Sequence, residues 1–95
     1  MEINHVRYFL ALCEERNFNR AAKRCGVTQP SLTNAIKRLE SLIGGTLFIR
    51  RPNIQPTELA LAIKPHFEHI MQGVALAIEA ANRLRDHRQE SRWPA

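Results

Sequence analysis

The chain has 95 residues and a mass of 10.9 kDa, which leaves room for one domain, or for a very small domain with an appendage. Hydrophobic residues make up 44% and charged residues 24%, which argues against a disordered chain, while the length excludes two-lobed enzymes, barrels and dinucleotide-binding folds of ordinary size. The net charge of +5 lies in the first part. Residues 1–56 carry nine Lys and Arg against four Asp and Glu, and residues 57–95 carry five of each. Such concentrated positive charge favours a polyanionic partner.

An anionic membrane surface is a weaker candidate than nucleic acid for that partner. No apolar run in the sequence approaches the ~20 residues of a membrane-spanning helix. The first residues, MEINHVRYF, also lack the charged and then apolar layout of a secretory signal. We therefore expect a cytoplasmic protein that engages no membrane.

Metal and disulfide chemistry have little support in the sequence. Cys13 and Cys25 lack the CxxC spacing of zinc sites, and we interpret both as small buried hydrophobic residues, with a redox switch or a disulfide as the alternative. His66 and His69 lie three residues apart, but a metal site needs more ligands. We expect neither a metal nor a cofactor.

The first two predicted helices lie in the N-terminal third of the chain. Apolar side chains recur at helical spacing over residues 5–15, with Asn4 as the expected N-cap. A second, short helix is predicted over residues 20–25, with Asn19 as its N-cap and Gly26 as its end. Two alanines in this second helix have almost no side chain, so another helix can approach closely.

A third helix is predicted over residues 29–43, because Thr28 suits an N-cap, Pro30 is tolerated in the first turn and two glycines follow the last apolar residue. Its apolar stripe consists of Leu32, Ile36, Leu39 and Ile43, widened by Ala35 and Leu42. The opposite face carries two positive charges and no negative one, and it consists of Pro30, Thr33, Asn34, Lys37 and Ser41, with Arg38 on the flank.

A small hairpin, or wing, is predicted after the third helix. Residues 46–49 form a short run typical of a β-strand, residues 50–53 are typical of a turn, and residues 54–56 form a second short extended piece. Pro56 is tolerated only at the edge of a sheet, which fits a two-stranded hairpin.

The rest of the chain predicts one long helix over residues 58–88, about 46 Å in length, with Thr57 as its N-cap and a kink or local break at Pro65. Its apolar residues follow a heptad spacing: Ile63, Phe67, Ile70, Val74, Ala77, Ala81 and Leu84. Since the three preceding helices leave no surface to cover this stripe, we expect a second copy of the chain to cover it. Packing back on the same chain is the alternative. Residues 89–95 are expected to be a disordered tail.

The two middle helices form a helix-turn-helix over about residues 18–37. The second helix of such a motif fits the major groove, ~12 Å wide, and presents side chains to the base edges. The motif needs small residues on its first helix, an apolar turn residue and a capped second helix. The two alanines, Val27 and Thr28 supply these features in order.

A longer pattern of residues surrounds the motif: Arg7-Tyr8-Phe9, Phe18-Asn19-Arg20-Ala21-Ala22, Val27-Thr28-Gln29-Pro30-Ser31-Leu32-Thr33, Ile36, Leu39-Glu40, Leu42, Gly44, Leu47-Phe48 and Arg50. This pattern resembles the N-terminal domain of LysR-type transcriptional regulators over residues 1 to about 64. The resemblance implies a mainly α fold, with a winged helix-turn-helix over residues 1–57 and a linker helix over residues 58–88 that mediates dimerisation.

The resemblance also implies how such a protein works. Members of the family are bacterial regulators that bind partly palindromic promoter DNA as dimers, and the full-length proteins pair into tetramers. They sense a small-molecule inducer through a C-terminal effector-binding domain, which we expect to be absent from these 95 residues.

Matched position by position, the family pattern implies a groove-facing group of Gln29, Pro30, Ser31, Thr33 and Asn34. The amides of Gln29 and Asn34 can bond adenine, and Lys37 or Arg38 can reach guanine or phosphate.

The same pattern implies contacts to the DNA backbone. Asn19 and Thr33 are expected to bond phosphate oxygens, and Arg50 with Arg51 to flank the minor groove from the wing. The helices expected to begin at Arg20 and Gln29 would direct free N–H groups at the phosphates.

The sequence departs from the family pattern at several positions. Cys25 stands where the family usually has Leu, while Asn53 replaces a frequent second Arg and Pro56 replaces Leu in the wing. Leu59-Ala60 stand where Ala-Gly usually follow the capping Thr. These differences bear on the number of wing phosphate contacts and on the start of the linker helix.

Two functions of different classes fit these observations. The first is a sequence-specific DNA-binding domain that dimerises through residues 58–88. The second is a protein-interaction module whose heptad helix binds another partner and whose basic face is incidental. An enzyme is the poorest fit, because the sequence holds no paired carboxylates, no nucleophile with a base and no phosphate loop.

Overall fold

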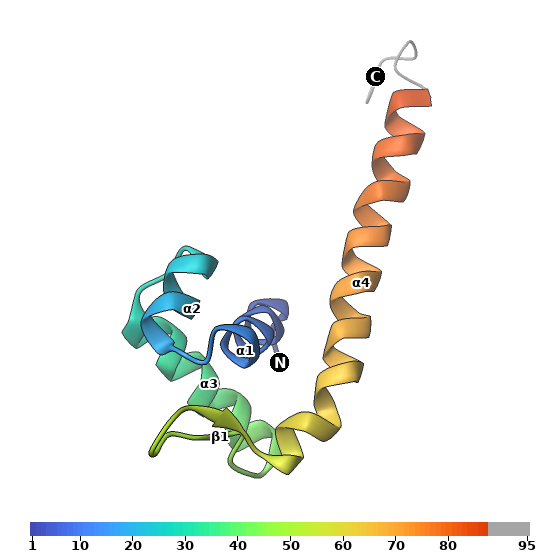
Figure 1. The fold of residues 1–95 in the computed structure, drawn as a ribbon. Helices are drawn as coiled ribbons and strands as arrows, with labels where there is room; N and C mark the ends of the chain where they lie inside the picture. Colours follow the sequence, from blue (N-terminus) through green and yellow to red (C-terminus); the bar gives the residue numbers. More distant parts are fainter. Residues whose placement is uncertain (88–95) are drawn as a thin grey trace.

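The computed structural model describes residues 1–87 of the chain, and Figure 1 shows its architecture. The elements in chain order are α1 (Ile3–Glu15), α2 (Phe18–Cys25), α3 (Gln29–Ile43), β1 (Phe48–Ile49), β2 (Gln55–Pro56) and α4 (Glu58–His87). The first three helices and the two strands form a body that we call the head, residues 1–57. Because α4 extends away from the head, the molecule measures 57 × 26 × 20 Å. The predicted mainly α fold with a wing and a long last helix is confirmed.

The first two helices begin earlier than predicted. Helix α1 starts at Ile3 and Glu2 is its N-cap, so Asn4 lies inside the helix and does not cap it. Helix α2 starts at Phe18, where the Asn17 side chain accepts a hydrogen bond from the Arg20 backbone N–H at 2.8 Å. The prediction of Asn19 as the cap is wrong, because Asn17, two residues earlier, holds the extended backbone conformation of an N-cap.

Helix α3 matches its prediction at both ends. Thr28 caps it by accepting from the Ser31 backbone N–H at 3.2 Å. The helix ends at Ile43, where Gly44 adopts a left-handed conformation with φ of 91° that is strained for other residues. Leu32, Ala35, Ile36 and Leu39 of the predicted apolar stripe are buried and Ile43 is half-buried, whereas Leu42, on the far edge of the stripe, is 58% exposed.

Aromatic rings join the separate elements at the centre of the head. The ring of Phe9 on α1 is fully buried and lies 5.6 Å from that of Phe48 on β1 and 5.1 Å from that of Phe67 on α4, measured between centroids. The leucines of this core, Leu12, Leu32, Leu39 and Leu47, are also fully buried. The wing and the start of α4 are therefore attached to the three helices through one continuous core.

The wing is a two-stranded antiparallel hairpin in which Phe48 faces Pro56 and Ile49 faces Gln55. Its attachment continues into α4, because Thr57 donates its backbone N–H to Leu47 O at 2.9 Å and its hydroxyl to Thr46 O at 2.7 Å. The Thr57 hydroxyl oxygen also accepts from the Ala60 backbone N–H at 3.2 Å, which confirms the predicted N-cap. The strands are shorter than predicted.

Helix α4 runs without interruption from Glu58 to His87 although Pro65 lies inside it. Figure 1 shows its first turns, in yellow, at an angle to the rest of the helix, so the proline is accommodated with a bend and the alternative of a local break is wrong.

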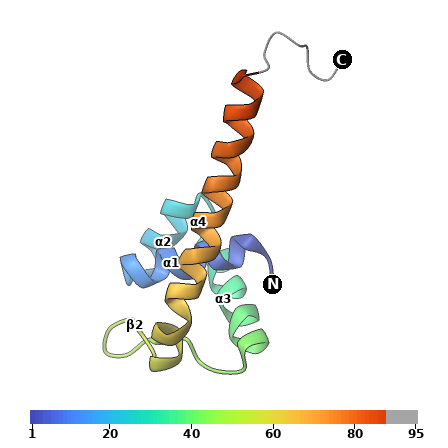
Figure 2. The same ribbon diagram turned by 90° about the vertical axis from the view of Figure 1, so that its right-hand side faces the viewer.

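The expectation that the head has no surface left for α4 is also wrong. Ile63, Phe67 and Met71 on α4 pack against the core of the head, and Figure 2 shows the lower half of α4 lying against α1. The two first residues of the predicted heptad stripe therefore belong to the core of their own chain. The predicted tail, residues 89–95, lies outside the described residues.

Candidate nucleic-acid interface

The helix-turn-helix is held by its caps and by two small residues. Ala21 and Ala22 are buried, so α1 and α3 pack close to the backbone of α2. At the turn, Gly26 is left-handed with φ of 71°, and Val27 donates its backbone N–H to Ala22 O at 3.0 Å. The Thr28 cap then starts α3 in a new direction. The local sequence thus fixes how α3 projects from the head.

The outer face of α3 is exposed and free of acidic side chains. The exposed residues are Pro30, Ser31, Asn34, Lys37, Arg38 and Ser41, with Gln29 half-buried at the start of the helix. On the opposite face Leu32, Ile36 and Leu39 are buried. The sequence prediction of which residues share the outer face agrees with this arrangement, apart from Thr33.

Thr33 lies at the border between the two faces of α3. Its hydroxyl oxygen is buried and has no hydrogen-bond partner within residues 1–87. The reason is its position directly after the buried Leu32 and three residues before the buried Ile36, which turns its hydroxyl toward the head. The expected bond from this hydroxyl to a phosphate therefore does not fit the observed side-chain position.

The start of α2 also differs from the expectation. Asn19 lies in the first helical turn with an exposed side chain, and the Asn17 cap occupies the Arg20 backbone N–H. At α3, Thr28 occupies the Ser31 N–H and Pro30 has none. The capping residue of α2 therefore differs from the predicted one, whereas the first turn of α3 is capped as predicted.

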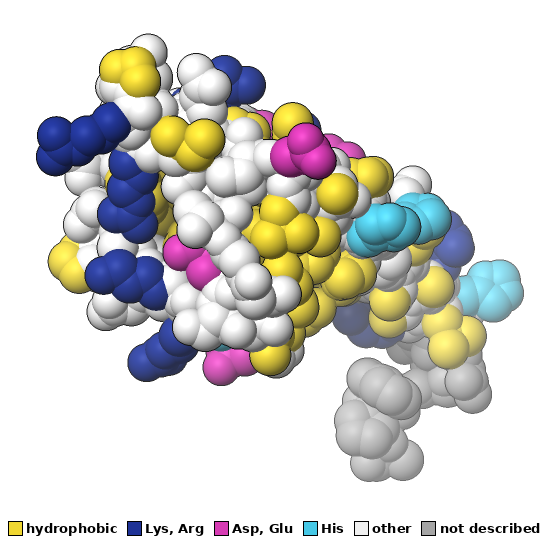
Figure 3. Space-filling model, turned by 90° about the horizontal axis from the view of Figure 1, so that it is seen from below, with side chains coloured by type: hydrophobic (Ala, Val, Ile, Leu, Met, Phe, Trp, Pro, Cys, Tyr) yellow, Lys and Arg dark blue, Asp and Glu magenta, His cyan; other side chains and the backbone are white. Residues whose placement is uncertain are grey.

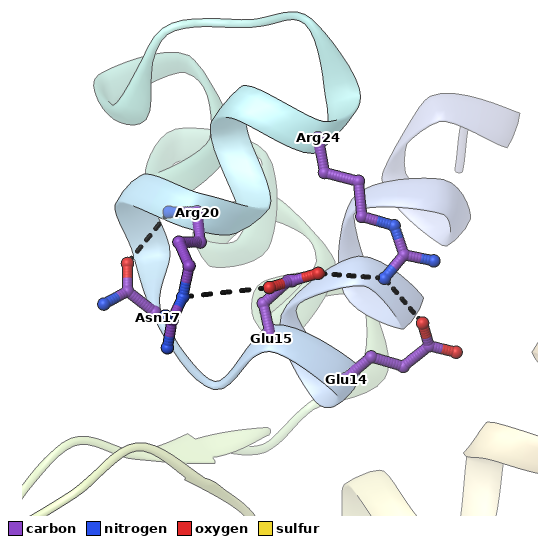
Figure 4. A network of polar contacts seen from close by, with 5 residues as sticks. All are labelled: Glu14, Glu15, Asn17, Arg20 and Arg24. Carbon is purple, nitrogen blue, oxygen red and sulfur yellow. Dashed lines mark hydrogen bonds and ion pairs between the residues drawn. The ribbon is translucent and has the colours of Figure 1, made fainter.

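Two arginines of α2 are paired with acidic residues at the end of α1, as Figure 4 shows. Arg24 Nη1 lies 2.5 Å from Glu14 Oε1 and 3.2 Å from Glu15 Oε2, and Arg20 Nε lies 3.8 Å from Glu15 Oε1. The hydrogen bond to Glu14 raises the pKa of the Arg24 guanidinium above its ordinary value. Exposed pairs of this kind contribute little to stability, but they lower the positive charge that α2 presents.

The cations of α3 and of the wing are different, because no carboxylate lies within ion-pair distance of them among residues 1–87: Lys37, Arg38, Arg50 and Arg51. Figure 3 shows Lys and Arg side chains gathered along the edge of the head away from α4, whereas histidine and hydrophobic side chains follow α4. Four cations without a carboxylate partner among residues 1–87 therefore lie on α3 and the wing, while Arg7, Arg16 and Lys23 elsewhere in the head also lack one.

The wing arginines lie in different surroundings. The guanidinium carbon of Arg50 lies 4.7 Å from the centre of the Phe18 ring, at the first position of α2, while Arg51 has an exposed side chain in the turn. Sequence reasoning used Phe18 only as part of the family pattern and missed this contact. No local signal could reveal it, because the two residues are 32 positions apart in the chain.

Sequence reasoning also missed a role for Arg7 on α1. Its guanidinium donates to Cys25 O, the last carbonyl of α2, at 2.8 Å and to Asn4 Oδ1 at 3.3 Å. A cation at a helix C-terminus satisfies an open carbonyl and interacts favourably with the helix dipole. Arg7 therefore secures the end of α2 and lies away from the outer face of α3.

The remaining residues of the heptad stripe lie on the part of α4 beyond the head. Ile70 is 40% exposed, Leu84 is 57% exposed, Val74 is half-buried, and Ala77 and Ala81 are exposed. Other apolar side chains there, Leu76 and Ile78, are also exposed. A shallow hollow on this helix is lined by His66, His69, Ile70, Gln72, Gly73 and Leu76. Within residues 1–87 no group of three or more His, Cys, Asp or Glu has the arrangement of a metal site.

Comparison with known proteins identifies the family. The family described as bacterial regulatory helix-turn-helix protein, lysR family, matches residues 3–61. The chain belongs to the LysR family. The match covers more than half of the chain and confirms the resemblance seen in the sequence.

Relatives in this family are transcriptional regulators. The chain is 38% identical over 87 residues to the regulator IlvR of Caulobacter vibrioides, covering 90% of this chain and 29% of IlvR. It is 40% identical over 85 residues to the regulator BudR of Klebsiella aerogenes, covering 90% of this chain and 58% of BudR. The chain thus spans less than two thirds of the length of either relative.

Solved structures agree with the same assignment. The DNA-binding domain of BenM in complex with catB site 1 DNA superimposes with a TM-score of 0.84 at 27% identity, covering 92% of this chain and 95% of that one. The same domain with benA site 1 DNA gives 0.80 at 30% identity, covering 88% and 96%. The chain is therefore a LysR-type helix-turn-helix DNA-binding domain, of the kind found in the transcriptional regulators to which it is similar. None of the helices within residues 1–87 is both long and apolar enough to cross a lipid bilayer.

Proposed function

We propose that this LysR-family domain binds promoter DNA sequence-specifically as a homodimer, with α3 in the major groove and the wing along the backbone and minor groove. The observation that carries this proposal is the exposed, acid-free outer face of α3 beside cations without carboxylate partners. A helix that presents such a face fits the width of the major groove. Two neighbours of this fold are themselves DNA complexes, which supports the proposal.

Base recognition is assigned to the first half of α3. Asn34 is exposed in the middle of the outer face, where its amide can both donate to and accept from adenine. Gln29 is half-buried at the start of the helix and has the same chemistry. Pro30 and Ser31 lie between them, and we assign both to contacts with the base edges. Lys37 and Arg38, one helical turn further along α3, would reach guanine or phosphate.

Backbone contacts are assigned to side chains around this helix. Asn19 and Arg20 at the start of α2 and Arg50 with Arg51 on the wing would bond phosphate oxygens. Arg20 is only loosely held by Glu15 and is 70% exposed, so a phosphate can replace that carboxylate. Thr33 would contribute only if its hydroxyl turned outward.

The dimer interface is assigned to the part of α4 beyond the head. Its stripe of Ile70, Val74, Ala77, Ala81 and Leu84 has the spacing of a coiled coil, and much of it is exposed in one copy of the chain. Ile63 and Phe67 would support this interface from within the core of their own head. Two heads held by such an interface would address half-sites separated by about one or more helical turns, ~34 Å each, which requires partly palindromic DNA.

For the complete regulator we propose the properties that the family implies. A promoter-binding regulator acts where bacterial DNA lies, in the cytoplasm. Tetramers and the response to a small-molecule inducer would depend on an effector-binding domain outside these 95 residues.

Selection of binding sites from random duplex DNA tests the proposal most directly. We expect the enriched sequences to contain two inverted half-sites with one preferred spacing, because two identical heads are joined at a fixed distance. Enrichment of a single unpaired half-site would contradict the dimer, and no enrichment at all would contradict sequence-specific binding.

Two substitutions then separate base contacts from backbone contacts on the selected site. Asn34→Ala is expected to relax the base preference at one position in each half-site and to weaken binding by about 1–3 kcal/mol. Arg50→Ala is expected to weaken binding to all duplexes alike and to reduce the slope of log K against log salt by about 1 for each head. If neither change altered binding, the assigned face would be wrong.

The alternative, a protein-interaction module, is supported by the same exposed side chains of α4. Light scattering combined with gel filtration distinguishes the two functions. A dimer in the absence of other proteins supports the DNA-binding proposal, whereas a monomer at high concentration that also fails to bind duplex DNA at low salt supports the alternative.

A further inference from the structure

The wing and α2 meet in a contact between a cation and an aromatic ring. The Cζ atom of Arg50, just after β1, lies 4.7 Å from the centre of the Phe18 ring on α2. Phe18 is half-buried and packs against the core of the head on its other side. In both ribbon views the wing lies on the side of the head where α2 begins (Figures 1 and 2).

We propose that Phe18 is a positioning residue for DNA binding, because its ring holds the Arg50 guanidinium in place on the DNA-facing side of the wing. The inference rests on the proposed function, and it concerns how the wing is oriented rather than which residue meets the phosphate. Arg50 makes the DNA contact, and Phe18 acts through Arg50.

The chemistry of the contact suits this role. A guanidinium attracted to a ring approaches the negatively polarised face of the ring, and its five N–H donors lie in its own plane, so they stay available at its edge. A carboxylate in place of the ring would order the arginine equally well but would neutralise it. Glu14 and Glu15 hold Arg24 in that manner on the neighbouring surface. Phe18 therefore orders Arg50 without lowering its charge.

Ordering matters because a free arginine side chain samples many rotamers. Immobilising such a side chain on a phosphate opposes binding, and a side chain that is already placed avoids much of that loss. Buried Phe48 attaches the wing to the core, but Arg50 lies beyond the end of β1, and β1 and β2 have only two residues each. An anchor beyond the hairpin itself is therefore significant for where the wing cation lies.

Arg51 provides the internal comparison. It is the next residue in the chain and is also exposed, but no aromatic ring within residues 1–87 lies in contact with its guanidinium. Phe18 should therefore affect the contribution of Arg50 to binding and leave that of Arg51 unchanged.

A double-mutant cycle on a selected duplex tests the inference. The affinities of the wild-type chain, Phe18→Leu, Arg50→Ala and the double variant are measured by fluorescence anisotropy, with thermal unfolding recorded for each variant. Leucine keeps the apolar packing of Phe18 and removes the aromatic face. We expect Phe18→Leu to weaken binding by about twofold to fivefold, the range for an exposed cation–ring contact, and to have no effect once Arg50 is alanine.

A matched control cycle uses Arg51→Ala in place of Arg50→Ala. In this cycle the fold-losses of affinity caused by Phe18→Leu and by Arg51→Ala should multiply in the double variant. Phe18→Tyr, which keeps the ring, should bind as the wild type does. If Phe18→Leu does not fold, Phe18→Met takes its place in both cycles.

The outcomes separate the inference from the proposed function. If the wild-type chain binds no duplex, the proposed function fails and the inference fails with it. If the wild-type chain binds but Phe18→Leu weakens binding by the same factor with and without Arg50, Phe18 is only structural and the inference alone is overturned. An unchanged affinity of Phe18→Leu would overturn it as well.

Discussion

The head and the distal part of α4, residues 75–87, contain similar apolar side chains with opposite surroundings. In the head Phe9, Leu12 and Leu39 are fully buried, and α1, α2, α3 and β1 all contribute to a shared core. In distal α4 Leu76 and Leu84 are 55% and 57% exposed. Burial of apolar area is the main favourable contribution to folding, so the head contains the source of its own stability. Isolated helices are marginal in water, and distal α4 has no comparable source of stability among the described residues of its own chain.

The largest expected effect comes from removing the ring at the centre of the head. Phe9→Ala deletes the side chain that contacts Phe48 and Phe67 and should lower the free energy of unfolding by about 3–5 kcal/mol. Urea denaturation followed by circular dichroism measures this. Leu76→Ala, in distal α4, is the matched control and should leave the unfolding of the head nearly unchanged. If the two substitutions lowered the free energy of unfolding equally, the head and distal α4 would not differ in their contribution to stability.

A second prediction concerns the buried thiol of the head. Burial raises the pKa of Cys13 from 9.0 to about 11. The native state therefore keeps the proton that the unfolded state loses, and the stabilisation is complete below pH 9 and is lost as the pH rises toward 11. The free energy of unfolding should fall by about 2 kcal/mol between pH 8 and pH 11 on account of this thiol. Urea titrations at several pH values measure the loss.

Other groups also titrate in this range, so the comparison is with Cys13→Ala, which lacks the thiol. The wild type should lose more stability than this variant over the same pH interval. Parallel pH profiles of the two proteins would contradict the assigned burial of Cys13.

A third prediction addresses the exposed side of α4. Ile70→Glu places a charge within the proposed dimer stripe and should raise the dissociation constant of the dimer at least about tenfold, or ~1.4 kcal/mol. Sedimentation equilibrium measures the constant. Leu61→Glu changes a similarly apolar and more exposed residue that lies outside the stripe, and it should leave the dimer intact. If Ile70→Glu has the same dimer dissociation constant as the wild type, Ile70 does not belong to the dimer interface.

The smallest effect concerns the cap that distinguishes two neighbouring asparagines. Asn17→Ala removes the acceptor for the Arg20 backbone N–H and should lower the free energy of unfolding of the head by about 1 kcal/mol. Asn19→Ala should leave stability unchanged and weaken DNA binding slightly. Thermal unfolding together with anisotropy measures both properties, and the reverse pattern would restore Asn19 as the cap.

Several features were predictable because they depend on nearby residues. Thr28, Pro30 and Gly44 mark the ends of α3 by chemistry that operates within a few positions, and both ends were predicted correctly. The spacing of apolar residues also predicted which face of α3 is turned outward. The local sequence did not decide between Asn17 and Asn19 as the N-cap of α2, because both are asparagines, a residue type that favours the N-cap. The structure decides for Asn17, because α2 starts at Phe18.

The sequence alone determined the fold class, the family, the course of α3 and the excess positive charge of the head, because periodicity, capping and composition are local or summed properties. Only the tertiary structure decided which arginines are neutralised by Glu14 and Glu15, that Ile63 and Phe67 cover their own head, and that Arg50 rests on Phe18. These outcomes depend on residues that are distant in the chain and become neighbours only when the elements pack around Phe9.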